Sequence, residues 1–129
     1  MRVPTGIPAL DSLLQGGFPE HSAILVTGST GTCKTLFAGQ FLWAGLERGE
    51  TAVFVTLEES PDEIRADMQQ FSWDFAAMEQ RGLLKLIHHS PAQLDTLATA
   101  ITKELTTLKA RRLVIDPAAL ISLTVNDQA

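Results

Sequence analysis

One short stretch of the sequence has the residue types and the spacing of a phosphate-binding loop. Residues 28–35 read Gly-Ser-Thr-Gly-Thr-Cys-Lys-Thr. They meet the pattern Gly-x-x-x-x-Gly-Lys-[Ser/Thr] at every fixed position but one, because Cys33 stands where the second glycine belongs. Backbone N–H groups of such a loop surround phosphate oxygens, and the helix that follows points its positive end at them. The alternative is an ordinary strand–turn–helix connection in which Lys-Thr occurs by chance.

The residues of the loop have separable predicted roles. Lys34 would place a cation against the β- and γ-phosphates, and the hydroxyl of Thr35 would bind Mg²⁺. The side chain of Cys33 would point into space that the phosphates or the packed loop need. A thiol beside Lys34 at a helix N-terminus should also ionise readily and repel the phosphates. A redox role for this thiol stays open beside simple loss of constraint. The predicted nucleotide-binding residues are Ser29, Thr30, Gly31, Thr32, Cys33, Lys34, Thr35 and Leu36.

Three carboxylates follow two other apolar runs. Asp116 comes after Leu-Val-Ile and is predicted to be a Walker B acid that orients the shell of Mg²⁺, although an Asp that opens a turn before Pro117 is the simpler alternative. Glu58 and Glu59 follow the run 51–57, where a glutamate can hold a water molecule in line with a γ-phosphate. Both glutamates also suit the first turn of a helix, where negative charge is favourable. The sequence does not indicate which of Glu58 and Glu59 would position the water.

The pattern of apolar residues predicts the elements that position these side chains. Strands are expected over 21–27, 51–57, 83–88 and 111–116, and helices over 9–14, 36–48, 61–70, 74–80 and 92–109. Ser60, Pro61 and Glu63 give the third helix an N-cap, a proline in its first turn and a capping box. Strands that alternate with helices predict one α/β domain over 1–129, with a mostly parallel sheet and helices on both faces. In such sheets, ligands bind at the carboxyl ends of the strands.

The composition narrows the class of protein. The chain has 129 residues, a formal net charge of −5 and one cysteine. An acidic balance argues against a nucleic-acid surface, and a single cysteine excludes an intrachain disulfide. The first residues do not read as a signal peptide and no apolar run is long enough to cross a membrane, so a cytoplasmic protein is expected.

Other chemistry-bearing residues have simpler structural interpretations. His88-His89 have no Cys or His partner at metal-ligand spacing, so a strand end that turns into a loop is favoured over a metal site. Trp43 and Trp73 lack an interleaved basic run, which favours core packing over base stacking. Arg111-Arg112 are interpreted as a solvated start of a strand rather than a nucleic-acid contact.

Taken together, these motifs resemble the KaiC-type branch of RecA-like P-loop ATPases. The resemblance covers nearly the whole chain, and its motifs occur in the order of the family. The matching stretches are Thr5-Gly6-Ile7, Leu10-Asp11, Gly16-Gly17, 28–42, 54–61, 71–74 and 111–116.

The resemblance implies an ATP-binding, Mg²⁺-dependent ATPase domain that assembles into hexameric rings with the nucleotide between subunits. Some members are circadian clock ATPases that also phosphorylate themselves. By position, Lys34 and Thr35 would bind phosphate and Mg²⁺, Glu58 and Glu59 would be catalytic, and Asp116 would be the Walker B acid.

The chain departs from the family in three respects. Cys33 replaces a glycine, and Pro117 stands where a small hydroxyl residue is usual. In RecA-like sheets a later strand lies between the Walker B strand and the P-loop strand, and residues after Asp116 do not supply it, so a partial, N-terminal portion of the domain is expected. Three functions are therefore weighed: an ATPase with possible autokinase activity, a degenerate nucleotide-binding or assembly module without turnover, and a recombinase-like DNA-handling ATPase, against which the acidic charge argues.

Overall fold

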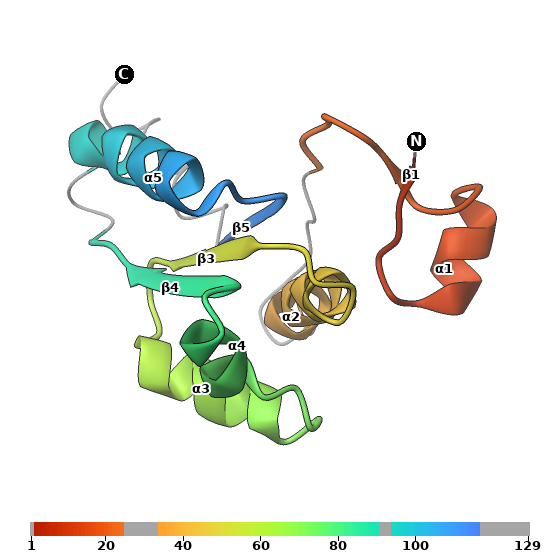
Figure 1. Cartoon of the computed structure of the whole chain (residues 1–129), viewed down its shortest axis with the longest axis horizontal. Coiled ribbons are helices and arrows are strands. Elements are labelled where there is room, and N and C mark those ends of the chain that lie inside the picture. The colour runs from red at the N-terminus through yellow and green to blue at the C-terminus, as the bar shows by residue number, and fades with distance from the viewer. Residues whose placement is uncertain (1, 25–33, 91–93, 117–129) are drawn as a thin grey trace.

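Three parallel strands form the centre of the chain (Figure 1). The computed structural model describes residues 2–24, 34–90 and 94–116. The strands are β1 (Arg2–Val3), β2 (Phe18–Pro19), β3 (Ala52–Thr56), β4 (Leu84–His88) and β5 (Arg112–Asp116). The helices are α1 (Pro8–Leu13), α2 (Lys34–Leu46), α3 (Pro61–Gln69), α4 (Phe75–Gln80) and α5 (Leu94–Leu108).

The central sheet has the order β4-β3-β5, and both pairings are parallel. Ala52 lies opposite Leu84 and Arg112, and Thr56 lies opposite His88 and Asp116. The carboxyl ends of the three strands are therefore level. Helix α5 covers one face of the sheet, and α3 and α4 cover the other (Figure 1). The predicted α/β sheet with helices on both faces is confirmed.

Strand β3 is buried on both faces because its apolar residues continue without interruption. Ala52 and Phe54 pack into the core formed with α2, α3 and α4, whereas Val53 and Val55 pack against α5. Successive side chains of a strand point to opposite faces, so one apolar run supplies two cores.

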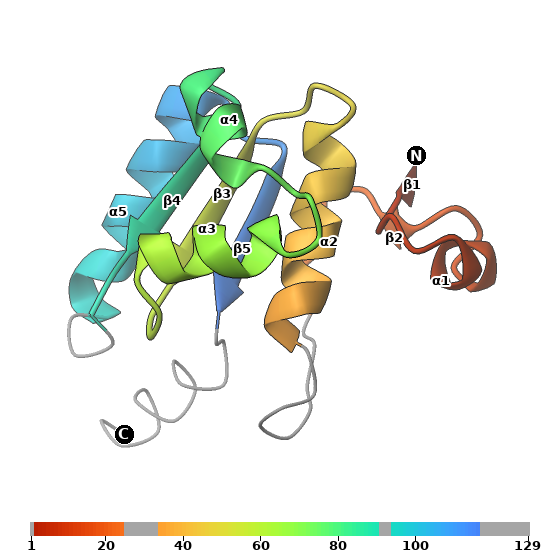
Figure 2. The ribbon, with the colours of Figure 1, turned by 90° about the horizontal axis from the view of Figure 1, so that it is seen from below.

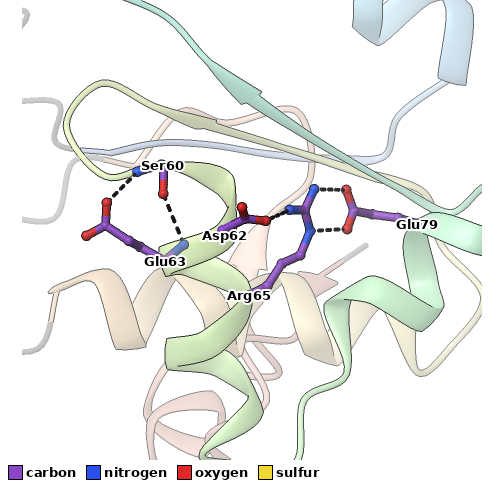
Figure 3. Close-up of polar contacts among 5 residues, drawn as sticks. All are labelled: Ser60, Asp62, Glu63, Arg65 and Glu79. Carbon is purple, nitrogen blue, oxygen red and sulfur yellow. Dashed lines mark hydrogen bonds and ion pairs between the residues drawn. The ribbon is translucent and has the colours of Figure 1, made fainter.

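Helix α3 begins where its capping signals predict. The Ser60 hydroxyl accepts a hydrogen bond from the Glu63 N–H at 3.2 Å, and the Glu63 carboxylate accepts one from the Ser60 N–H at 3.1 Å (Figure 3). These bonds satisfy two backbone donors that a helix start leaves without partners. Arg65 then joins α3 to α4, donating to both carboxylate oxygens of Glu79 at 2.6 and 2.9 Å and to Asp62 at 2.7 Å.

The strand predicted from His21 is wrong over the part that the structure describes. His21 has a positive φ of 62°, and residues 21–24 are exposed and form no strand. A left-handed residue cannot continue an extended strand, and the exposed run finds no neighbouring strand among the described residues. Residues 25–27 lie outside the description. The short pairing of Arg2 with Pro19 and Val3 with Phe18, in β1 and β2, is too brief to leave a sequence signal.

Arg112 is not the solvated strand start that its sequence position suggested. Its relative exposure is 2%, and its guanidinium contacts Glu50 and two backbone carbonyls. Trp43 and Trp73, by contrast, pack against the core on the α2 side of the sheet, which confirms their predicted role. No helix in the described parts of the chain is long and apolar enough to cross a membrane.

Candidate functional site

The candidate site lies at the carboxyl edge of the sheet, where α2 begins. Figure 2 shows the first turn of α2 and the carboxyl end of β5 at the same edge of the molecule. Helix α2 starts with Lys34 and Thr35, β5 ends at Asp116, and the turn after β3 carries Glu58 and Glu59. The parallel arrangement brings these segments together, as expected for a site at the end of a parallel sheet.

Thr35 and Asp116 are in direct contact although they are 81 residues apart in the sequence. The Thr35 Oγ1 donates a hydrogen bond to Asp116 Oδ2 at 2.8 Å. The backbone of Asp116 is held as well, because its carbonyl accepts from the Leu57 N–H at 2.9 Å. A hydroxyl and a carboxylate held side by side are oxygen ligands of the kind that Mg²⁺ binds.

The donor set fits Mg²⁺ held partly by a nucleotide rather than by protein alone. Within the described ranges, no group of three or more His, Cys, Asp or Glu side chains could hold a metal ion. Mg²⁺ in nucleotide sites is commonly held by one or two protein oxygens together with phosphate oxygens and water. Thr35 and Asp116 match that pattern.

The two adjacent glutamates have different environments. Glu58 is exposed, whereas Glu59 is half-buried and its Oε2 is buried without a hydrogen-bond partner among the described residues. Burial raises the pKa of Glu59, and the nearby carboxyl group of Asp67 and the negative charges of Glu63 and Asp116 raise it further. The carboxyl group of Glu59 is thus close enough to Asp116 for their negative charges to interact.

A side chain at the end of β3 fixes the turn that carries Glu59. The Thr56 hydroxyl, which is buried at the end of β3, donates to the backbone carbonyl of Glu59 at 2.8 Å. This bond closes the turn between β3 and α3 and holds the Glu59 backbone at the sheet edge.

A cavity of about 220 Å³ opens beside the first turn of α2. Phe71 is 46% exposed and stacks on Trp73, with ring centroids 5.2 Å apart. The cavity therefore combines polar groups near the start of α2 with apolar and aromatic surface at the end of α3 and just after it. Its lining residues are Thr35, Leu36, Asp67, Met68, Gln70 and Phe71.

Part of the predicted site falls within the described structure. Lys34, Thr35 and Leu36 form the start of α2, and Thr35 meets Asp116. His88 lies at the strand end level with Thr56, and the His89 N–H donates to the Thr56 carbonyl, in keeping with a strand that turns into a loop. The predicted loop residues Ser29, Thr30, Gly31, Thr32 and Cys33 lie outside the described residues.

Asp67 is a site residue that the sequence reasoning missed. It faces Glu59 from α3 and lines the cavity with Thr35. A signal existed, because Asp67 is four residues after Glu63 and therefore on the same side of the helix as the capping box.

The comparisons with known proteins agree with this geometry. The family model described as "ATPase: KaiC" matches residues 3–129. The chain belongs to the KaiC ATPase family. A UPF0273 protein of Methanopyrus kandleri is 41% identical over 132 residues, covering 89% of this chain and 52% of that protein. The circadian clock protein KaiC3 of Synechocystis is 36% identical, covering 99% of this chain and 28% of that protein.

A solved structure gives the same fold. The crystal structure of a KaiC-like protein of Pyrococcus horikoshii is 44% identical with a TM-score of 0.84, over 90% of this chain and 53% of that one. The RecA-like fold expected from the motifs is thereby confirmed. The chain spans about half the length of two UPF0273 proteins that it matches, since it covers 52% of one and 58% of the other.

Proposed function

We propose that this chain is a Mg-ATP-binding part of a KaiC-type ATPase. The observation that carries the proposal is the hydrogen bond of 2.8 Å between Thr35 and Asp116. It joins the last residue of the P-loop motif to the predicted Walker B acid, which is the contact that a shared Mg²⁺ site requires.

Each residue has a chemical role in this proposal. Lys34 would neutralise the β- and γ-phosphates, and Mg²⁺, held through Thr35 and Asp116, would offset the charge that develops on the phosphates. Glu59 would hold a water molecule in line with the γ-phosphorus and accept its proton as the bond from phosphorus to the β–γ bridging oxygen breaks. The raised pKa of Glu59 makes its carboxylate a stronger base.

Mg²⁺-dependent nucleotide binding tests the metal ligands. Calorimetry should show that the unaltered chain binds Mg-ATP more tightly than ATP in EDTA. Asp116→Asn and Thr35→Ala should remove most of this difference, whereas Thr35→Ser keeps the hydroxyl and should retain it. Binding that is equally tight with and without Mg²⁺ in all of these proteins would contradict the proposed site.

Phosphate release distinguishes the two glutamates. Glu59→Gln should lower the rate about 100-fold, the usual scale for loss of a general base. Glu58→Gln, the matched control at the exposed neighbour, should change it little. Equal losses in the two variants would remove the specific role of Glu59.

A nucleotide-binding or assembly module without turnover is the second candidate. One observation favours it: Cys33 occupies a glycine position of the motif. Tight Mg-ATP binding without phosphate release, in this chain and in Cys33→Gly alike, would support this candidate over an active ATPase.

Assembly into a hexameric ring, with self-phosphorylation as in some clock ATPases, is the finer form of the proposal. It rests on membership of the family and on the similarity to a circadian clock protein. Light scattering with and without Mg-ATP tests the assembly, and transfer of labelled γ-phosphate to the chain tests the kinase activity.

A further inference from the structure

Arg112 is a buried cation away from the candidate site. Its side chain is 1% exposed, at the start of β5. Its Nε donates to Glu50 Oε1 at 3.0 Å, and its Nη1 donates to the carbonyls of Pro4 at 2.7 Å and Phe41 at 2.6 Å. The guanidinium carbon also lies 4.7 Å from the centre of the Phe41 ring. One side chain thus joins the N-terminal segment, α2 and the loop before β3.

The surroundings are shaped to admit this side chain. A Cβ at Gly45 would lie 2.5 Å from the Arg112 Nε and 2.6 Å from its Cδ. The Nη2 is buried and has no hydrogen-bond partner among the described residues. Burial of a cation costs free energy that its partners only partly offset, so the benefit of such a group is often positional.

Helix α2 and strand β5 are joined at two points. At one end of the strand, Arg112 binds the Phe41 carbonyl in the second half of α2. At the other end, Asp116 accepts a hydrogen bond from Thr35 in the first turn of α2. Because both elements are stiff over this length, a shift at the Arg112 contact changes the distance between Thr35 and Asp116.

The N-terminal segment 2–19 packs against the same part of α2, around Phe41 and Arg112. Thr5 is buried, and Asp11 holds it by accepting from its N–H at 2.8 Å and from its hydroxyl at 2.7 Å. Phe18 packs against Phe41 with ring centroids 6.0 Å apart. In both ribbon views this segment lies beside α2 (Figures 1 and 2).

We propose that Arg112 is a positioning residue, which couples the seating of segment 2–19 on α2 to the geometry of Thr35 and Asp116. The proposal rests on the proposed Mg-ATP site. A displaced N-terminal segment would weaken nucleotide binding from the second half of α2, away from the residues that hold Mg²⁺.

Two variants test the coupling, one by changing Arg112 itself and one by releasing the N-terminal segment. Arg112→Lys keeps the positive charge but has one nitrogen in place of a planar fork, so it cannot serve Glu50, Pro4 and Phe41 together. Asp11→Ala leaves Arg112 intact and releases Thr5. Each variant should weaken Mg-ATP binding about tenfold, which is within the usual range of coupling between distant sites. The Kd for Mg-ATP of the double variant should be no higher than that of the single variant with the larger loss, because both changes break the same connection.

A third variant separates positioning from general loss of stability. Arg65→Met removes another arginine with several hydrogen bonds, between α3 and α4, and should lower the midpoint of thermal unfolding without changing the Kd for Mg-ATP. A lower midpoint with an unchanged Kd in Arg112→Lys as well would overturn the proposal. Additive losses of affinity in the double variant would overturn it too.

Hydrogen exchange keeps the test independent of nucleotide. If the unaltered chain does not bind Mg-ATP, the proposed function fails, but the coupling still predicts faster exchange at the amides of residues 35–41 in Asp11→Ala. Unchanged exchange there would overturn the coupling by itself.

Discussion

At the scale of single residues, the structure separates two neighbouring glutamates that look equivalent in the sequence. Glu58 is exposed, and Glu59 is half-buried beside Asp67 and within electrostatic range of Asp116. Burial and like charges oppose ionisation of Glu59, so the ionised group destabilises the fold. A residue that is costly to the fold and useful in chemistry is typical of a functional site.

The pH dependence of stability should reveal this cost. The pKa of Glu59 in the folded chain is above its ordinary value of 4.5, so the folded state holds this proton more tightly than the unfolded state. The stabilisation from Glu59 is therefore complete below about pH 4.5 and is lost as pH rises through the raised pKa. Glu59→Gln should be more stable than the unaltered chain at pH 8 and equal to it near pH 4, as measured by urea unfolding. A constant difference across this range would contradict the assignment.

The effect of Cys33 on the affinity for Mg-ATP can also be tested by substitution. Replacement by glycine removes both the side-chain bulk and the thiol, so Cys33→Gly should bind Mg-ATP at least about tenfold more tightly by calorimetry. Cys33→Ser keeps a side chain but does not ionise. If Ser restores as much affinity as Gly, charge is the obstacle; if it restores none, bulk is. No gain in either variant would contradict both explanations.

At the scale of elements, α2 depends on glycines where other segments pass closest. The absent side chain of Gly45 leaves room for Arg112, and that of Gly39 leaves room for Met68. Alanine is the better helix former by up to about 1 kcal/mol, but overpacking costs about 1–3 kcal/mol. The outcome depends on whether the neighbour can move.

Gly45→Ala should therefore destabilise the fold by about 1–3 kcal/mol in urea unfolding, because hydrogen bonds and the Phe41 ring hold Arg112 in place. Gly39→Ala is the matched comparison, since the end of the Met68 side chain is flexible and can shift. A larger cost at Gly39 than at Gly45 would show that Arg112 is less constrained than its contacts indicate.

The start of α3 offers a separate test. Ser60→Ala removes the hydroxyl that accepts from Glu63 N–H and should cost about 1 kcal/mol of unfolding free energy. Ser60→Asn keeps a capping acceptor and should restore most of this loss. A Ser60→Ala variant as stable as the unaltered chain would mean that the capping box contributes little.

The helices and strands also show which structural features could be predicted from the sequence. The buried run of β3 and the capping box at Ser60 were both predictable because each is a local pattern with one common structural solution. The burial of Arg112 was not, since its three partners come from distant parts of the chain. In the site, the Thr35–Asp116 contact followed from motif logic, whereas the role of Asp67 required the packing of α3.

At the scale of the whole molecule, nucleotide binding should be a source of stability. Ligand that binds only the folded state at 100 times its Kd adds about 2.7 kcal/mol, which for a domain of this size raises the unfolding midpoint by roughly 10 °C. Differential scanning fluorimetry with Mg-ATP should detect this shift, and Asp116→Asn should abolish it. An equal shift in that variant would point to a binding site elsewhere.

The contact between Thr35 and Asp116 has a consequence for the order of folding. The two residues are 81 positions apart, and β5 must dock beside β3 before they can meet. Closing so long a loop is slow compared with the formation of local helices. During synthesis, the contact between Thr35 and Asp116 therefore cannot form until residue 116 has left the ribosome, after the whole of α2, α3 and α4. The contact of the N-terminal segment with β5 also depends on this strand, because the Pro4 carbonyl accepts its hydrogen bond from Arg112. Segment 2–19 is thus made long before the arginine that joins it to α2 and to the loop before β3.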